Sequence, residues 1–228
     1  AGYISFNNVE VGRQQADGVM KALGIENWDV AANGPARVVM LGGSPTDNNA
    51  ILFRQGQEEI VTPYVDAGKA EIVADQWVEG WSADNALKLM ENILTGANND
   101  VDAVVASNDQ TALGALQALR AQGLAGKVPI SGQDATADGC NSIVKGELTV
   151  SILKDIRNLA PIAVDMVDAL LKGEEVEGLQ EYTLAELTND DSLQGNVKAL
   201  FLPVEQVNKD NVFDLCVANG FQSYDDVF

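Results

Sequence analysis

The sequence predicts an α/β fold built on a doubly wound parallel sheet, and three observations lead to this prediction. Short apolar runs alternate with segments of helical pattern along most of the chain, and the connections between them are short. Several apolar runs also end in polar residues immediately before the next helical segment. Strict alternation of this kind is typical of βαβ units, in which successive strands are parallel. We therefore expect one lobe to be nearly complete by residue 153.

The elements of this lobe follow from local pattern. Residues 3–6 form an apolar run that ends at Asn7, and an apolar stripe at helical spacing then continues to Gly24, a residue type that commonly ends helices. Ser82 is placed to cap the helix that follows it. The expected strands are 3–6, 36–41, 70–74, 103–107, 128–133 and 148–153, and the expected helices are 9–23, 47–66, 82–97, 109–122 and 136–145.

The pattern changes after residue 153. The expected elements there are a helix at 158–172, a strand at 180–183, a turn at 189–192, a strand at 198–202 and one or two short helices within 205–219, before an acidic tail. The helix has a broad apolar face that few other segments of this chain can cover. We therefore expect residues 1–153 and 189–228 to form one lobe. Residues 154–188 would be a crossover segment of a second lobe that is mostly absent.

Composition narrows the class of protein and its partners. Of the 228 residues 46% are hydrophobic, and the formal net charge is −20, which is typical of a soluble protein with a well-solvated surface. So acidic a surface repels nucleic acid and anionic lipid, and neither is an expected partner. No apolar run approaches the roughly 20 residues of a membrane-spanning helix, so we expect no membrane insertion. The first residues carry no basic region, so we expect any signal peptide to be already absent.

The chain offers little for catalysis or metal binding. It has no histidine and no Gly-x-Ser-x-Gly nucleophile pattern. The run Gly42-Gly-Ser-Pro45 lacks the spacing of phosphate-binding loops, and residues 189–194 lack a complete calcium-loop pattern. Cys140 and Cys216 have no metal-ligand spacing, and a disulfide and two buried thiols are equally compatible with the sequence. We expect no catalytic residue, no metal and no cofactor.

Polar side chains follow two neighbouring strands of the expected sheet. Asn108 and Asp109 come directly after the run 103–107, and Gln133 and Asp134 end the run 128–133. Ligands of open α/β sheets bind in the crevice outside the carboxyl ends of the strands. Amides and carboxylates can each engage adjacent hydroxyl groups, so this edge suits a neutral polyol.

At these two places the sequence resembles the periplasmic sugar-binding proteins of ABC transporters, in the branch that binds D-xylose or multiple sugars. The resemblance covers essentially the whole chain, in order and with family-like spacing. The stretches that carry it are Ala106-Ser-Asn-Asp109, Ser131-Gly-Gln-Asp134, Tyr3-Ile-Ser-Phe-Asn-Asn8, Gly43-Ser-Pro-Thr-Asp-Asn-Asn-Ala50, Leu52-Phe-Arg-Gln-Gly-Gln57, Asp75-Gln-Trp-Val-Glu-Gly-Trp81, Gly123-Leu-Ala-Gly-Lys127 and Pro203-Val-Glu-Gln-Val-Asn208.

The resemblance implies a type I, Venus-flytrap receptor that captures a monosaccharide such as xylose for an ABC permease. It implies a periplasmic or extracellular location, with or without a lipid anchor, and hinges near Asn7-Asn8, Lys154-Asp155 and Thr188-Asn189. The family begins with an N-terminal lobe that this chain mostly lacks, so we expect pairing with that lobe or self-association. The ligand contacts of the branch fall on Asn49, Arg54, Trp81, Asn108, Asp134 and Lys154.

Each of these residues also has an ordinary structural explanation. Asn49 fits the first turn of a helix, and Arg54 and Lys154 could be solvated surface charges. Asn108 and Asp134 could cap the helices that follow them. The choice between Trp81 and Trp77 for the cleft is not decided by pattern alone, and Trp81 is favoured. Asp109 and Gln133 are the next candidates, as supporting or capping residues.

Two other classes of function fit the same fold. The chain could be the sugar-sensing module of a signalling system, or the effector domain of a transcription regulator, which would carry a basic helix-turn-helix ahead of residue 1. It could also be a doubly wound enzyme, although no nucleophile–base pair is visible.

Overall fold

The computed structural model describes residues 2–188 and 190–228, which divide into two compact units. The larger unit comprises Asn8–Leu153 and Glu205–Phe228, and the smaller one comprises Lys154–Val204 with the first residues up to Asn7. The chain therefore passes between units at residues 7–8, 153–154 and 204–205. The first two passages lie at the expected hinges. The third does not lie near Thr188, and the expected boundary at residue 189 itself falls outside the described residues.

The division differs from the expected one because of strand pairing. The first strand, β1 (Gly2–Phe6), pairs in parallel with β8 (Asn196–Leu202), which pairs antiparallel with β7 (Gln180–Thr183). Residues 2–7 and 190–204 therefore group with 154–188 and not with the larger unit. A local apolar pattern identifies a strand but not the strand with which it pairs, so the sequence could not assign β1 to the smaller unit.

The larger unit holds six strands: β2 (Ala36–Gly42), β3 (Ala70–Trp77), β4 (Ala103–Ala106), β5 (Ser131–Gln133), β6 (Val150–Leu153) and β9 (Glu205–Val207). They pair in the orders β3-β2-β4 and β5-β6-β9, and a parallel bridge between Val104 and Ile130 joins the two groups. Every pairing is parallel except that of β6 with β9. The expected doubly wound parallel sheet is confirmed.

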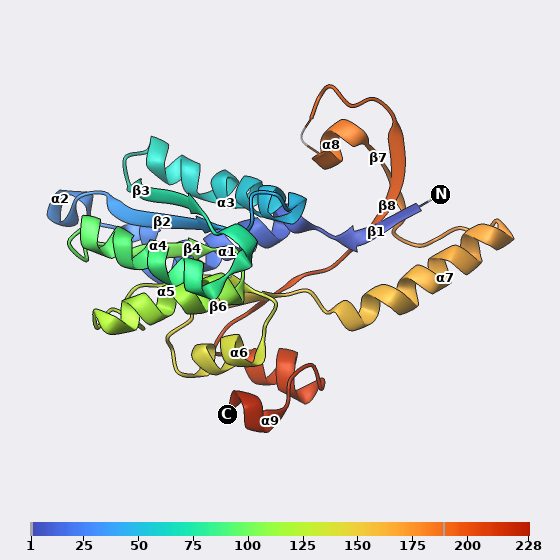
Figure 1. The fold of residues 1–228 in the computed structure, drawn as a ribbon. Helices are drawn as coiled ribbons and strands as arrows, with labels where there is room; N and C mark the ends of the chain where they lie inside the picture. The colour runs from blue at the N-terminus through green and yellow to red at the C-terminus, as the bar shows by residue number, and fades with distance from the viewer. Residues whose placement is uncertain (1, 189) are drawn as a thin grey trace. The chain divides into compact units, whose positions relative to one another are not determined.

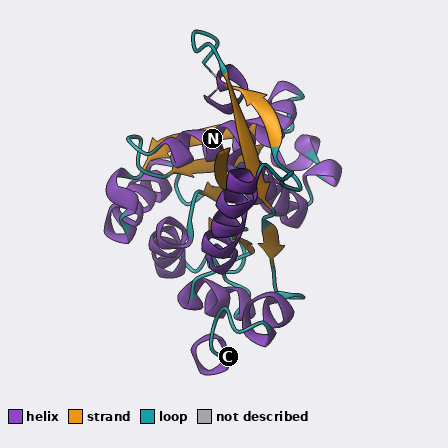
Figure 2. Ribbon diagram, turned by 90° about the vertical axis from the view of Figure 1, so that its right-hand side faces the viewer, coloured by secondary structure: helices purple, strands orange, loops and turns teal. Residues whose placement is uncertain are grey.

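Helices cover both faces of this sheet (Figures 1 and 2). One face carries α1 (Asn8–Leu23) and α3 (Asn48–Asp66), and the other carries α4 (Ala83–Gly96), α5 (Asp109–Ala121) and α6 (Ala137–Val144). Short helical segments complete the unit: η1 (Ile25–Asn27), α2 (Val30–Asn33), η2 (Glu79–Trp81), η4 (Phe213–Ala218) and α9 (Tyr224–Val227).

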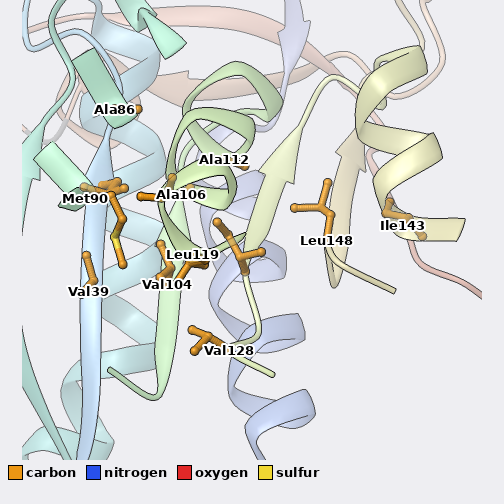
Figure 3. Packing of buried hydrophobic residues seen from close by; sticks show 14 of the residues in the cluster. Val39, Ala86, Met90, Val104, Ala106, Ala112, Leu119, Val128, Ile143 and Leu148 are labelled. Carbon is orange, nitrogen blue, oxygen red and sulfur yellow. The ribbon is translucent and has the colours of Figure 1, made fainter. Parts of the chain in front are cut away.

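Two cores form because side chains alternate across the central strands. Val38 and Met40 of β2 belong to the cluster under α1 and α3, whereas Val39 and Leu41 belong to the cluster under α4, α5 and α6. Figure 3 shows Val39 of β2 beside Met90 and near the side chains of β4 in this second cluster. Both faces of β2 are buried, which explains its continuous apolar sequence.

Two segments differ from expectation. Residues 75–77, expected as a loop, extend β3 to Trp77, because the partner strand β2 continues to Gly42 and pairs with it there. Residues 205–207, expected to begin a short helix, form β9 along the otherwise open edge of β6. A three-residue strand has no periodicity to recognise, so only the pairing reveals it.

The smaller unit packs one long helix against its three-stranded sheet. The helix α7 (Leu159–Lys172) follows the turn η3 (Ile156–Asn158), and α8 (Leu184–Thr188) follows β7. Met166 is the only residue of α7 that is buried, and it lies against the backbone of Gly2 in β1. Val164, Val167 and Leu171 are exposed, Leu171 by 83%. The broad apolar face that the sequence indicated is therefore uncovered in part, at Val167 and Leu171, whereas most of its other residues are half-buried.

Both cysteines are buried thiols that are not joined in a disulfide. Cys140 on α6 and Cys216 in η4 share the core under α4, α5 and α6. The contact with the Cys216 thiol, together with burial, raises the pKa of Cys140. None of the helices in the described ranges is both long and apolar enough to cross a bilayer.

The helices α1 and α3 approach each other at backbone distance. A methyl group at Gly12 of α1 would overlap the carbonyl oxygen of Phe53, and one at Gly56 of α3 would overlap the carbonyl oxygen of Val9. Each glycine thus receives the backbone of the opposite helix. Any side chain at either position would force the two helices apart.

We expect Gly12→Ala or Gly56→Ala to lower the free energy of unfolding by about 3 kcal/mol, because the added methyl meets rigid backbone. Urea denaturation would measure this. Gly96→Ala at the exposed end of α4 is the matched control, since nothing lies within 4 Å of that site. It should be neutral or stabilising by up to about 1 kcal/mol. Equal effects at all three sites would contradict the close approach.

Candidate functional site

The carboxyl ends of β2, β4 and β5 lie along one edge of the larger unit's sheet. The chain adds β3 on one side of β2 and then β4 on the other, so the strand order reverses between β2 and β4. A crevice at such a reversal is the usual ligand site of open α/β sheets. Gly43 follows β2, Asn108 lies just beyond β4, and Asp134 follows β5. Two of the expected site residues are thus placed at this edge by the strands themselves.

Trp81 lies at the same edge, beyond the end of β3. It belongs to η2 and has a positive φ of 56°, which directs the chain back over the end of β2. Its ring lies so close to Gly43 that a methyl group there would overlap the indole. Phe53 of α3 supports the ring edge-on, with centroids 6.2 Å apart. The half-buried indole therefore presents a fixed apolar plate next to the end of β2.

Arg54 is buried next to the Trp77 ring and is not a solvated surface charge. Its Nη1 donates to Asp75 Oδ1 of β3, and its guanidinium lies 4.9 Å from the ring centroid of Trp77. Its side chain is 6% exposed, against 46% for Asp75. Buried Nε and Nη2 donors of Arg54 have no acceptor within the described chain. The structure thus gives Trp77 a supporting position under Arg54, while Trp81 lies at the edge.

The absence of a side chain at Gly42 makes this arrangement possible. A methyl group there would come within 2.9 Å of Arg54 Nη2 and would also press on the Trp77 ring. The glycine that ends β2 and the glycine that follows it thus make room for two indole rings and one guanidinium.

Asn108 caps the N-terminus of α5, which is the ordinary structural role that the sequence allowed for it. Its Oδ1 accepts from the Thr111 backbone N–H at 2.9 Å, and the residue is buried. Its Nδ2 is the group that remains for a ligand. Capping and binding are compatible here, because an amide has separate acceptor and donor ends.

Asn49 lies in the first turn of α3, with its backbone N–H bound to Asp47 Oδ1. Its side chain is exposed, and its Oδ1 accepts from Asn8 Nδ2 at 2.6 Å. This bond joins the first turns of α1 and α3. The donor end of the Asn49 amide therefore stays free to turn outward.

Asp134 occupies a strained turn at the end of β5. Its φ is 104° and that of Ala135 is 45°, values that non-glycine residues rarely adopt. The carboxylate is exposed at the edge and accepts from the side-chain amide of Gln133. Strain of this kind persists only where the surroundings enforce it, and it clusters at functional sites.

Lys154 is the first residue after β6 of the larger unit, and it belongs to the smaller unit. Its Nζ lies 5.9 Å from the ring centroid of Phe6 in β1. Lys154 lies where the chain passes between the units, as the sequence suggested. The contact of its side chain is with Phe6 of the smaller unit.

A buried amide network supports the ends of β4 and β5. Gln15 of α1 donates from Nε2 to the carbonyl of Ser107 at 2.8 Å and to that of Gly132 at 3.3 Å. Its Oε1 accepts from Gln57 Nε2 of α3 at 2.8 Å. The backbone carbonyls directly before Asn108 and Gln133 are therefore held by one side chain, which sets the spacing of the two strand ends.

Asp109 lies beneath the Asp134 turn and is fully buried. Burial raises the pKa of its carboxyl group to about 7, although hydrogen bonds from Ser151 and Thr136 act in the opposite direction. The charge of the neighbouring Asp134 raises it further. Within residues 2–188 and 190–228 no three Cys, Asp or Glu side chains converge as metal ligands.

Several residues of this site were not expected from the sequence. Asp75 was missed because it was placed in a loop, and Trp77, which was weighed against Trp81 for the cleft, contacts Arg54. A signal did exist for Gln15 and Gln57, since each lies one helical turn from an apolar core residue, Val11 and Phe53. A glutamine in the middle of an apolar helix stripe indicates a buried hydrogen-bond network.

Comparison with known proteins agrees with this architecture. A family model described as a periplasmic binding protein domain matches residues 1–175. The D-xylose-binding periplasmic protein of Escherichia coli K12 is 46% identical over 219 residues, covering 96% of this chain and 61% of that protein. The multiple sugar-binding periplasmic receptor ChvE of Rhizobium radiobacter is 33% identical over 237 residues, covering 98% of this chain and 64% of that receptor.

Solved structures give the same result. An ABC transporter solute-binding protein from Clostridium phytofermentans with bound β-D-glucose is 30% identical, with a TM-score of 0.81 over 100% of this chain and 70% of that one. A carbohydrate transporter solute-binding protein from Chloroflexus aurantiacus in complex with D-glucose is 25% identical, with a TM-score of 0.79 over 97% of this chain and 68% of that one.

The chain spans less than two thirds of the length of the curated relatives named above. Its doubly wound sheet and the matched family model lead to the same assignment. This chain belongs to the periplasmic binding protein family and has its type I, Venus-flytrap fold.

Proposed function

We propose that the protein is a receptor that captures a monosaccharide, xylose or a similar aldose, for an ABC sugar transporter. The observation that carries this is the grouping of a guanidinium, an indole plate, amides and a carboxylate at the edge formed by the ends of β2, β4 and β5. Relatives named for D-xylose and for multiple sugars support it. A periplasmic or extracellular location follows from the same relatives.

The chemistry of a pyranose matches these groups. Its vicinal hydroxyls each donate and accept, and one face of its ring exposes apolar C–H groups. Trp81 offers a broad surface for that face, while Asn108 and Asp134 can each engage adjacent hydroxyls. Hydrogen bonds to charged groups contribute about 1.5–3 kcal/mol each, more than bonds between neutral groups. The chemistry of this edge is therefore that of binding, and we infer that the protein is not an enzyme.

Arg54 adds a specific argument. Its two unpartnered buried donors cost free energy as long as no acceptor is supplied, by about 1–3 kcal/mol per buried group. A sugar hydroxyl can provide the missing acceptor, and an epimer that places the hydroxyl elsewhere cannot. We infer that Arg54 contributes to discrimination between sugars as well as to affinity. Asn49 and Lys154 complete the proposed contacts.

Isothermal titration of the whole protein with D-xylose, L-arabinose, D-glucose and D-galactose tests the proposal. We expect saturable binding of at least one sugar, and we expect Trp81→Ala to weaken it about tenfold or more by removing the apolar plate. Trp28→Phe is the matched control, because Trp28 bonds to the carbonyl of Gly34 in a loop after α1. It should leave affinity unchanged. Absence of heat with every sugar would refute the proposed function.

The uncovered face of α7 leads to a proposal about partners. We propose that it packs against a further lobe of the same protein, or against a second copy when this chain is isolated. Support comes from the exposure of Val164, Val167 and Leu171, and from relatives that are longer than this chain. An apolar helix face in water favours association. The ABC permease is the proposed partner of the whole protein.

For this chain expressed alone, we expect sedimentation velocity to show self-association that increases with concentration. The double substitution Val164→Glu with Leu171→Glu should shift the protein towards monomer by placing charges on the face. Val30→Glu in α2 of the larger unit is the control, since Val30 is also exposed but outside that face. A wild-type chain that stays monomeric at all concentrations would contradict the proposal.

A further inference from the structure

Asp109 is bound into the structure as an acceptor of several donors. Its Oδ1 accepts from Ser151 Oγ at 2.6 Å. Its Oδ2 accepts from the Thr136 backbone N–H at 2.7 Å and from Thr136 Oγ1 at 2.9 Å. Methyl groups at Gly132 or Gly139 would overlap these two oxygens. A socket lined by glycines and filled with donors fits an ionised carboxylate.

The groups that bind Asp109 also hold the strained turn formed by Asp134 and Ala135. Ser151 Oγ also accepts from the Ala135 backbone N–H at 2.9 Å, and the backbone N–H of Asp134 donates to the carbonyl of Ile152 at 3.0 Å. The carbonyl of Ala135 accepts from Cys140 Sγ and from Gln222 Nε2. Asp109 thus anchors Thr136 on one side of Ala135 and, through Ser151, Ala135 itself.

We propose that Asp109 is a positioning residue: its carboxylate holds the turn that aims Asp134 at the ligand, and its protonation releases that turn. The inference rests on the proposed sugar-binding function. A proton on Oδ1 would face the Ser151 hydroxyl hydrogen, so one of the two would lose its acceptor. The Ser151 hydroxyl would then act only as an acceptor, for Asp109 and for Ala135, and the bonds from Thr136 would lose the extra strength that a charged acceptor gives them. Sugar affinity should therefore depend on the charge of Asp109.

The range of pH in which this occurs is unusual for a carboxyl group. Burial raises the pKa of Asp109 to about 7, and the ionisable groups that act with it are Asp134 and Cys140. Ordinary carboxyl groups remain ionised between pH 5.5 and 8, and the chain has no histidine that could titrate there. A pH dependence of affinity in that window points to Asp109.

Stability and affinity should then change in opposite directions. Because the folded-state pKa lies above the unfolded value, the folded protein keeps a proton that the unfolded chain has released between about pH 4 and 7. The free energy of unfolding therefore falls as pH rises through this range and levels off above it. Sugar affinity rises as pH passes through the folded-state pKa of about 7. A residue that only supported the fold would not produce opposite trends.

Titration calorimetry of the whole protein with D-xylose from pH 8 to pH 5.5 tests the inference. We expect the wild-type Kd to rise about tenfold on acidification. Asp109→Asn should bind about tenfold more weakly at pH 8, because a neutral amide holds the Thr136 donors less strongly than a carboxylate does, and its pH profile should be flat because the amide does not titrate. Ser151→Ala removes one donor to the carboxylate, so the midpoint of its profile should move to higher pH.

Asp102→Asn is the matched control at the opposite end of the same strand. Asp102 accepts from the Arg37 backbone N–H at 2.8 Å, so its loss should lower stability but leave Kd and its pH profile unchanged. A wild-type Kd that does not vary with pH, or an Asp109→Asn variant with wild-type affinity, would overturn the inference while leaving the proposed function intact.

Hydrogen exchange measures how well the amides of the turn are protected, and it needs no ligand. We expect the protection factors of the Ala135 and Thr136 amides to fall below pH 7 in the wild type and to be low at every pH in Asp109→Asn. If the wild type binds no sugar, the proposed function fails, and this measurement still decides whether Asp109 holds the turn. Unchanged protection in Asp109→Asn would refute the inference.

Discussion

The site depends on how the ends of β4 and β5 are held together. These two strands share a single parallel bridge, so backbone pairing alone does not set their spacing. Side chains take over this role. Ser131 Oγ donates to the carbonyl of Ala106 and accepts from its N–H, and Gln15 spans the carbonyls of Ser107 and Gly132. Asn108 directly follows Ser107, and Asp134 lies two residues after Gly132, so the separation of the two residues depends on buried polar side chains.

This arrangement requires the close approach of α1 and α3. Gln15 and Gln57 come from the two helices and meet in the core, which is possible because Gly12 and Gly56 let the backbones touch. Buried amides are costly unless they are satisfied, and here most of their capacity is used within the network. The close packing of α1 and α3 thus allows the buried hydrogen bonds to form, and these bonds position the strand ends at the edge of the sheet.

Arg54 and Asp134, the charged groups at this edge, are oriented in two different ways. Arg54 is oriented by Asp75 and by the Trp77 ring, and it keeps unused donors. Asp134 is oriented by a strained turn that a buried carboxylate enforces. Both are charged groups held rigid before any ligand arrives, and rigidity of this kind reduces the entropy lost on binding. A site of amides, charges and one indole can therefore be selective for the ligand whose groups match it.

The sequence by itself determined the larger unit's alternating strands and helices, the strand ends at Asn108 and Asp134, and the family resemblance. These are local features, read from periodicity and from polar residues at the ends of apolar runs. Only the tertiary structure decided that β1 pairs with β8, that β9 closes the edge of β6, and that residues 75–77 belong to β3. It also buried Arg54 and Asp109. Strand partners and burial depend on contacts between residues distant in the chain, and no local pattern encodes them.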